Sequence, residues 1–192
     1  MSKSTISKKI LFWYDNNKRI LPWRKNTSKD QKLYFTLVSE FMLQQTQVST
    51  VIPYFKRFVQ KIPNFKKLSK ANDQILMKLW EGLGYYSRAR NLKKSAIMIN
   101  GKFGGILPSN FEDLKSLPGI GDYTSTAIMA IAFNQKFIPL DGNVERILKR
   151  VLYLRSEKTI SKENMQISKK FFGLSERASD YAQAIMELGA LV

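Results

Sequence analysis

Residues 117–121 read LPGIG, a proline and two glycines between two apolar segments. Apolar residues recur at helical spacing on both sides of it, in residues 111–117 and 123–132. Proline and glycine are typical of helix ends, and two glycines allow the chain to reverse within a few residues. The segment therefore predicts two helices joined by a short hairpin.

The hairpin has the features of a phosphate-binding loop. Gly119 and Gly121 have no Cβ atom and can adopt positive φ, so a phosphate can come close to the backbone N–H groups. The N-terminus of the following helix carries a partial positive charge that attracts an anion. Such a loop holds a nucleic-acid backbone without reading a base. An ordinary turn, in which the glycines serve only the chain reversal, explains the same pattern.

The rest of the chain repeats the helical spacing. Apolar residues follow it in almost every segment, and no segment alternates with a period of two residues. Gly82 and Gly101 mark predicted helix ends after residues 72–81 and 88–100. The sequence therefore predicts an all-α protein with about ten short helices.

Charge favours a polyanionic partner. The 192 residues include 32 lysines and arginines against 15 aspartates and glutamates, which gives a net charge of +17. Nucleic acid is the foremost partner for such an excess. A basic surface that meets only solvent explains the same charge.

Several classes of chemistry are excluded by composition. The chain has 0 cysteines and 0 histidines, so disulfides, thiol nucleophiles and imidazole catalysis are absent from these residues. Proton chemistry must use carboxylates, tyrosine, lysine or water. The N-terminus lacks the apolar run of a signal peptide, and no stretch approaches the ~18 apolar residues of a membrane span. We expect a cytoplasmic protein with no membrane partner and no metal site in this chain.

Glu40 is a candidate general acid. It lies within LYFTLVSEFML at residues 33–43, a run so apolar that the helix should be buried nearly all round. Leucines three and seven residues before it and three after it lie along its face. Burial disfavours the charged form and raises the pKa of a carboxyl group, which suits a general acid near neutral pH. The alternative is a place at the polar edge of the helix, beside Gln44 and Gln47.

Asp141 is the second carboxylate in an unusual place. It immediately precedes a helix predicted over residues 144–153, where aspartate is a favoured N-cap. Hydrogen bonds from the helix amides should keep Asp141 ionised while burial pushes Glu40 toward protonation. Two carboxyl groups in opposite protonation states can serve as an acid and an anionic stabiliser. A purely structural cap is the alternative for Asp141.

Five short motifs follow one another along most of the chain. They are LPW at residues 21–23, SEFMLQQTQV at 39–48, GLGYYSRARNL at 82–92, LPGIGDYT at 117–124 and LDGNVERIL at 140–148. Together they resemble the adenine DNA glycosylases, a branch of the helix-hairpin-helix glycosylase superfamily. LPGIG with a downstream aspartate is typical of the superfamily, and MLQQTQV with GLGYY is typical of the adenine branch.

The resemblance implies a fold and an activity. It implies two helical lobes: a six-helix barrel at residues 24–135 that carries the hairpin, and a second lobe of residues 1–23 and 136–192. The protein would act as a monomer on double-stranded DNA, in a nucleoid-associated cytoplasmic setting. It would extrude an adenine mispaired with guanine or 8-oxoguanine and hydrolyse its N-glycosidic bond.

The resemblance also implies roles for individual residues. Glu40 matches the acid that protonates adenine, and Asp141 matches the carboxylate that stabilises the positively charged sugar. Tyr123 and Asn143 would support the nucleophile or the sugar. The implied DNA contacts are Gln45 and Tyr85, which would wedge into the base stack, together with Thr46, Leu83, Gly119, Gly121 and Arg24. Without the motifs, Gln45 would read as a helix-surface amide and Tyr85 as a core aromatic.

Tyr123 separates the branches of the superfamily. Relatives that resemble endonuclease III carry a lysine at this position, two residues after the second hairpin glycine, and use it as a Schiff-base nucleophile. A phenol cannot form an imine, so we expect a monofunctional hydrolase. Some thymine-mismatch glycosylases also carry tyrosine here. The alternatives are therefore a thymine-mismatch or endonuclease III-like glycosylase, a catalytically dead DNA-binding remnant, or a basic helical scaffold without a DNA role.

The sequence also departs from the family pattern. Family members continue past the equivalent of residues 189–192 into a four-cysteine loop that holds a [4Fe–4S] cluster, and usually into a domain that inspects oxidised guanine. This sequence stops at Val192 before any cysteine, as a truncation or a reduced form would. We therefore expect no cofactor within it. The preference for the opposite base stays open.

Overall fold

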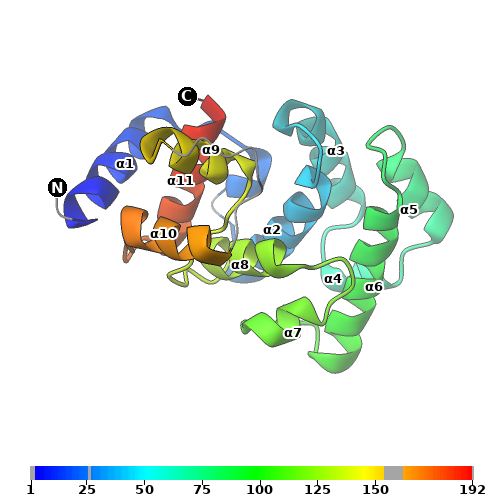
Figure 1. Cartoon of the computed structure of the whole chain (residues 1–192). Coiled ribbons are helices and arrows are strands. Elements are labelled where there is room, and N and C mark those ends of the chain that lie inside the picture. The colour runs from blue at the N-terminus through cyan, green and yellow to red at the C-terminus, as the bar shows by residue number, and fades with distance from the viewer. Residues whose placement is uncertain (1–2, 26, 154–161, 192) are drawn as a thin grey trace. The chain divides into compact units, whose positions relative to one another are not determined.

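The computed structural model describes residues 3–25, 27–153 and 162–191 of the chain (Figure 1). Within these ranges the chain forms eleven α-helices and one short 3-10 helix, and it forms no β-strand. The predicted all-α fold is therefore confirmed. None of the described helices is long and apolar enough to cross a membrane.

The chain divides into two compact units. Residues Ile20–Ile128 form one, here called the central unit, and Met1–Arg19 with Met129–Val192 form the other, here called the terminal unit. The central unit contains, in chain order, η1 (Pro22–Arg24), α2 (Lys29–Leu43), α3 (Val48–Lys61), α4 (Phe65–Ser69), α5 (Asp73–Trp80), α6 (Ser87–Lys102), α7 (Phe111–Lys115) and most of α8 (Asp122–Ile131). The terminal unit contains α1 (Lys3–Asn17), α9 (Gly142–Val151), α10 (Lys162–Phe172) and α11 (Ala178–Leu191).

The boundaries of these units differ from the predicted lobes, 24–135 and 1–23 with 136–192. At the first boundary, η1 packs against α2 and α3, which places residues 20–23 in the central unit. At the second, the Ser179 hydroxyl donates to the Ile131 carbonyl at 2.7 Å, so the end of α8 belongs with the terminal unit. A six-helix barrel in the central unit stays a prediction.

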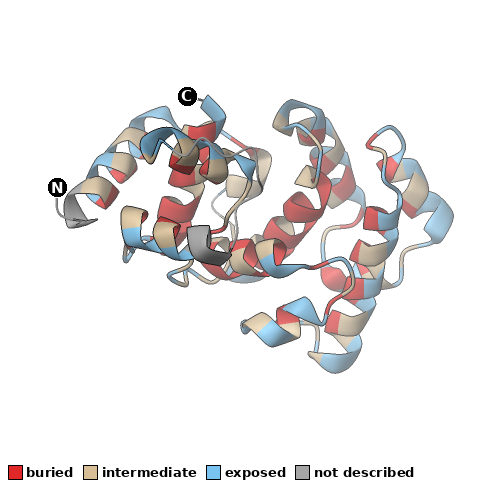
Figure 2. Cartoon of the chain, in the orientation of Figure 1, coloured by how far each residue is buried: buried red, intermediate tan, exposed pale blue. Residues whose placement is uncertain are grey.

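The core of the central unit is built around α2. The helix begins where the Ser28 side chain accepts a hydrogen bond from the Gln31 N–H at 3.3 Å, and Asp30 in the first turn favours the helix dipole. Most of its residues are then buried, as Figure 2 shows for much of its length. The Tyr34 hydroxyl donates to the Ile62 carbonyl at 2.5 Å, which ties α2 to the end of α3. The first turn of α2 is exposed, and most residues from Leu33 to Met42 are buried in the core.

Gly101 does not end a helix, contrary to the prediction. It lies inside α6, which runs from Ser87 to Lys102. The helix ends at Lys102, and the next residues but one, Gly104 and Gly105, adopt φ of 62° and 85°, with the Gly105 N–H donating to the Ile99 carbonyl at 3.0 Å. Left-handed glycine at this position satisfies the last helix carbonyls. Gly104 and Gly105, and not Gly101, form the left-handed turn that follows the helix.

The terminal unit has its own apolar core and a buried ion pair. Its core joins α1, α9, α10 and α11 through Leu11, Ile138, Val144, Leu148, Phe172, Tyr181 and Ile185. The Glu187 side chain is 1% exposed. It accepts hydrogen bonds from the Nε of Arg19 at 2.6 Å and from the backbone N–H of Arg19 at 3.0 Å. Because a buried carboxylate needs a charged partner, this pair fixes the end of α1 against α11.

Candidate functional site

Glu40 is buried on α2 of the central unit. Its residue is 6% exposed, and its neighbours Leu37 and Phe41 are fully buried. The predicted burial is confirmed, and a place at the polar edge of the helix is not. A buried carboxyl group that is not part of a helix cap is costly to maintain, and such groups concentrate at functional sites.

Asp141 caps α9 in the terminal unit, as predicted. One carboxylate oxygen accepts from the N–H groups of Asn143 at 3.0 Å and Val144 at 2.8 Å. The other accepts from the Asn143 side-chain amide at 2.8 Å. The carboxylate is thus held by three donors, all supplied by the first turn of its own helix.

The pKa of Asp141 moves in the direction opposite to the prediction. Burial of the half-buried Asp141 carboxyl raises its pKa above the ordinary value, and the hydrogen bonds from Val144 and Asn143 only partly offset this. The prediction weighed the helix amides and neglected the protein that covers the cap. Asp141 is therefore a carboxylate whose ionised form depends on its hydrogen bonds.

Two residues that the sequence reasoning missed support this cap. The Arg146 guanidinium donates to the Asn143 side-chain oxygen at 3.3 Å and also to the Gly189 carbonyl. A Cβ atom on Gly189 would lie 2.3 Å from the Asn143 carbonyl oxygen, so only glycine allows α11 to approach the start of α9 this closely. A glycine inside an apolar helix was the available signal, since such glycines usually have a packing reason.

The predicted hairpin joins α7 to α8. Gly119 adopts φ of +83°, and a Cβ atom there would lie 2.9 Å from side-chain atoms of Phe41 and Asn91. Gly121 does not adopt positive φ; its carbonyl accepts from the Ser125 N–H at 2.9 Å as α8 begins. No atom lies within 4 Å of the place a Cβ would take at Gly121, so its backbone is open on that side. Of the two hairpin glycines, only Gly119 adopts the left-handed conformation.

The predicted wedge residues lie on two turns of the central unit. Gln45 and Tyr85 both adopt left-handed backbone conformations, with φ of 56° and 48°, and both are exposed, Tyr85 by 62%. Thr46 is half-buried beside Gln45, and its N–H donates to the Leu43 carbonyl at 3.2 Å. Leu83 is only 6% exposed and belongs to the core. Of these candidates, Gln45 and Tyr85 present side chains at the surface.

The other predicted site residues divide between the units. Tyr123 lies in the first turn of α8 and Arg24 at the end of η1, both half-buried and both in the central unit with Glu40. Asp141 and Asn143 lie in the terminal unit. Each unit therefore carries one of the two candidate carboxylates.

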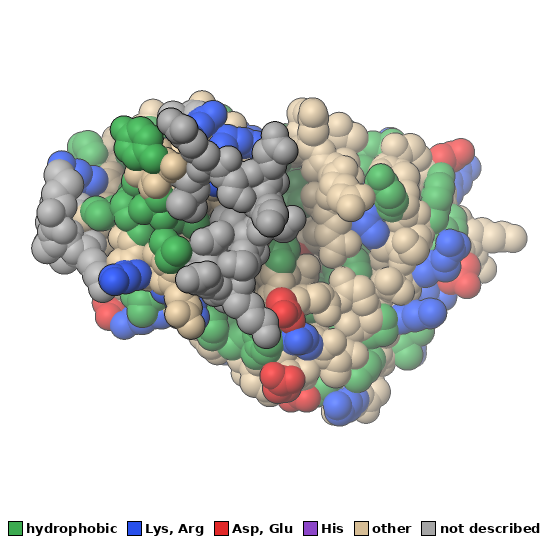
Figure 3. Space-filling model, in the orientation of Figure 1, with side chains coloured by type: hydrophobic (Ala, Val, Ile, Leu, Met, Phe, Trp, Pro, Cys, Tyr) green, Lys and Arg blue, Asp and Glu red, His purple; other side chains and the backbone are tan. Residues whose placement is uncertain are grey.

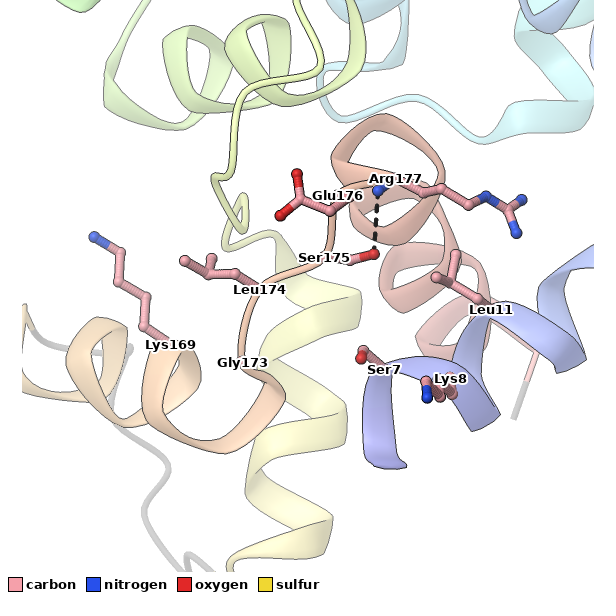
Figure 4. A pocket seen from close by; sticks show the side chains of 9 residues that line it. All are labelled: Ser7, Lys8, Leu11, Lys169, Gly173, Leu174, Ser175, Glu176 and Arg177. Carbon is pink, nitrogen blue, oxygen red and sulfur yellow. Dashed lines mark hydrogen bonds between the residues drawn. The ribbon is translucent and has the colours of Figure 1, made fainter. Parts of the chain in front are cut away.

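Neither the face shown in Figure 3 nor the hollow in the terminal unit locates the site. On the face shown in Figure 3, Lys and Arg side chains are scattered among uncharged ones and form no continuous patch among the described residues. A hollow of about 660 Å³ in the terminal unit is lined by Ser7, Lys8, Leu11, Lys169, Gly173, Leu174, Ser175, Glu176 and Arg177, none of them a predicted site residue (Figure 4). Lys169 and Arg177 point in different directions there, so they form no anion cradle.

A family model decides the relationship. Residues 38–172 match the model of the HhH-GPD superfamily base excision DNA repair proteins, which covers more than half of the chain. The chain belongs to the HhH-GPD superfamily. The match spans both wedge turns, the hairpin and both candidate carboxylates.

Curated relatives of this HhH-GPD chain are named adenine DNA glycosylases. The protein of Rattus norvegicus is 44% identical over 194 residues, which cover 95% of this chain and 37% of the relative. The protein of Buchnera aphidicola subsp. Acyrthosiphon pisum is 39% identical and covers 100% of this chain and 55% of the relative. The chain thus spans between about a third and somewhat more than half of the length of these relatives.

Solved structures share the fold. A thermostable thymine-DNA glycosylase superposes with a TM-score of 0.83 at 24% identity and covers 99% of this chain and 87% of its own. An endonuclease III trapped as a covalent intermediate with DNA superposes with a TM-score of 0.76 at 20% identity, with coverage of 97% and 85%. The two-lobed glycosylase fold implied by the motifs is therefore confirmed at the level of the fold.

The iron–sulfur cluster that the resemblance implies does not fit these residues. The 192 residues contain 0 cysteines, and the part of the chain that the structure describes holds no group of three or more acidic side chains able to bind a metal ion. Thiolate ligands are what such clusters require. No step of the chemistry below involves a cluster.

Proposed function

We propose that this chain is a DNA glycosylase that hydrolyses the N-glycosidic bond of an adenine mispaired with guanine or 8-oxoguanine in double-stranded DNA. The observation that carries the proposal is Glu40, a carboxyl group 6% exposed in a helix most of whose residues are buried. Membership of a base excision repair superfamily and the names of the curated relatives support the same activity.

The proposed chemistry assigns different tasks to the two carboxyl groups. Glu40 donates its proton to the adenine ring, so the base departs as a neutral leaving group when the sugar–base bond breaks. Asp141 in its ionised form stabilises the positive charge that develops on the sugar. A water molecule then adds to the sugar carbon and gives up a proton to the carboxylate left on Glu40, which restores the acid and leaves an abasic site. Asn143, which donates to Asp141 at 2.8 Å, keeps that carboxylate oriented.

Access to the base requires extrusion from the duplex. Flipping a base costs a few kcal/mol in lost stacking and pairing. We assign the wedge to Gln45 and Tyr85 because both side chains are exposed on backbone turns of fixed left-handed conformation. The backbone N–H groups of the Gly119–Gly121 hairpin hold a phosphate. Thr46 and Leu83 belong to the two turns that carry Gln45 and Tyr85, and together with Arg24 they complete the proposed DNA contacts.

Tyr123 sets the expected product. Its phenol cannot form an imine with the sugar, so the strand remains intact after the base is released. A tyrosine at this position also suits a thymine-mismatch glycosylase, and a solved structure of that name shares the fold. The substrate assay must therefore separate adenine from thymine.

The test measures base release under single-turnover conditions from three duplexes: adenine opposite 8-oxoguanine, thymine opposite guanine, and a fully paired control. We expect release of adenine from the first duplex only, strand breakage only after alkali, and no adduct trapped by borohydride. Release of thymine would identify the alternative glycosylase, and a trapped adduct would show lyase chemistry. Salt-sensitive binding to duplex without release of any base would indicate a DNA-binding remnant.

A further inference from the structure

A buried arginine joins the two turns that carry Gln45 and Tyr85. Arg88, on α6, is 6% exposed. One terminal nitrogen donates to the carbonyl oxygens of Phe41 at 3.2 Å, Met42 at 2.9 Å and Gln44. The other donates to the carbonyl oxygens of Leu83 at 3.0 Å and Gly84 at 3.2 Å.

The partners of Arg88 are unusual for a buried charge. None of its described contacts is with a carboxylate; all five acceptors are backbone carbonyls. Three of them belong to the C-terminal end of α2, where the unpaired carbonyls of a helix carry partial negative charge. The guanidinium also lies over the rings of Trp80 and Tyr85, 5.7 Å and 5.4 Å from the two centroids. Burial lowers the pKa of Arg88, so the environment is costly for this charge.

The carbonyls that Arg88 binds flank the two left-handed residues. Gln44 directly precedes Gln45, and Gly84 directly precedes Tyr85. A left-handed backbone is uncommon for residues other than glycine and persists only where the surroundings enforce it. The indole N–H of Trp80 also donates to the Gly84 carbonyl at 3.2 Å. One side chain thus fixes the backbone immediately before both residues.

We propose that Arg88 is a positioning residue that holds Gln45 and Tyr85 as one pre-formed wedge before DNA binds. This inference rests on the proposed function, which assigns the wedge to these two residues. Because both turns are already ordered, base extrusion does not carry the additional cost of fixing them. Arg88 itself is buried and acts only through the turns that it joins.

Arginine is required for this task. The planar guanidinium presents donors in a fixed fork that reaches two backbone segments at once, whereas a lysine ammonium is a single compact charge on a flexible stem. Arg88→Lys keeps the charge and therefore isolates the loss of the fork. Arg90→Lys is the matched control, because Arg90 lies two residues further along α6 and is exposed.

The experiment compares two duplexes that differ in how much wedging they need. One carries adenine opposite 8-oxoguanine, and the other carries adenine opposite an abasic site, where the base is unpaired and easier to extrude. We expect Arg88→Lys to slow single-turnover release from the paired duplex about tenfold or more and from the unpaired duplex less than threefold, since unpaired bases need least extrusion. Arg90→Lys should leave the ratio of the two rates unchanged. An equal loss on both duplexes would overturn the proposal.

A second measurement uses the native protein and does not depend on the folding of a variant. Amide hydrogen exchange is followed at Thr46 and Leu83, whose N–H groups donate to Leu43 at 3.2 Å and Trp80 at 3.0 Å within the two turns. We expect both amides to be protected without DNA and to change little when duplex is added. Protection that arises only with DNA would contradict a pre-formed wedge. If the wild-type protein releases no base, the proposed function fails, and this measurement still decides whether the two turns are ordered before DNA binds.

Discussion

Glu40 and Asp141 carry the same chemical group in two contrasting environments. Glu40 lies three residues before the end of α2, among mostly buried residues, whereas Asp141 stands at the first turn of a helix and accepts three hydrogen bonds. Burial on α2 keeps the carboxyl group of Glu40 away from water. At Asp141, backbone and side-chain donors orient the carboxylate. In the proposed mechanism, environment and not residue type divides the work between an acid and an anionic stabiliser.

Asp141→Asn removes the negative charge of the Asp141 side chain and keeps its shape. Asparagine is as good an N-cap as aspartate, so the stability of α9 should hardly change. The negative charge is lost, and we expect single-turnover adenine release to fall by about 10²-fold or more. Thermal unfolding and release kinetics measured on one preparation separate the two effects. A large drop in melting temperature with little loss of rate would make Asp141 a structural cap only.

Asn143→Ala tests how the environment of Asp141 controls the pH at which it ionises. The Asn143 amide lowers the raised pKa of Asp141, so its removal raises that pKa further. Because Asp141 must be ionised to act, activity falls as the pH falls through its pKa. We expect the acid limb of the pH–rate profile to move to higher pH in Asn143→Ala, with a loss of rate of about tenfold at neutral pH. An unmoved acid limb would remove Asp141 from the titration that controls activity.

Gly189→Ala tests whether the packing of α11 against the start of α9 supports the cap at Asp141. The added Cβ would lie 2.3 Å from the Asn143 carbonyl oxygen, so α11 must shift. We expect a loss of about 1–3 kcal/mol in the free energy of unfolding, as for other overpacked sites. Gly101→Ala is the matched control, because Gly101 also lies in a helix but no atom stands within 4 Å of its added Cβ. Equal stabilities for the two variants would refute a special role for Gly189.

Asp15→Asn should have the smallest effect on stability, and the pKa of Asp15 is shifted in the direction opposite to that of Asp141. Its ion pair with Arg177, at 2.7 Å, lowers the pKa of Asp15, whereas burial raises that of Asp141. The pair contributes stability above the ordinary pKa of 3.8, and this is lost as the pH falls through the lowered pKa. Since both side chains are partly exposed, Asp15→Asn should cost at most about 1 kcal/mol at pH 7. The difference in melting temperature from wild type should vanish in strong acid; a constant difference would argue against ionic stabilisation.

The sequence predicted local features well and distant contacts poorly. The burial of Glu40, the cap at Asp141 and the turn at Gly119 all follow from residues within one or two helical turns. Arg88 was missed because its acceptors lie up to 47 residues away and are backbone carbonyls, which leave no trace in the sequence. Gly189 contacts Asn143 in another helix, and the direction of the Asp141 pKa shift depends on what covers the cap. Local patterns hold no information on such packing.

The most direct test of the central claim is Glu40→Gln, which keeps the shape of the side chain and removes its acidic proton. Single-turnover adenine release and binding are measured on a duplex with adenine opposite 8-oxoguanine, with Glu112→Gln, an exposed residue on α7, as the control. We expect Glu40→Gln to bind the duplex nearly as well as wild type but to release adenine at least about 10²-fold more slowly, whereas the control should match wild type. Near-normal release by Glu40→Gln would contradict this expectation.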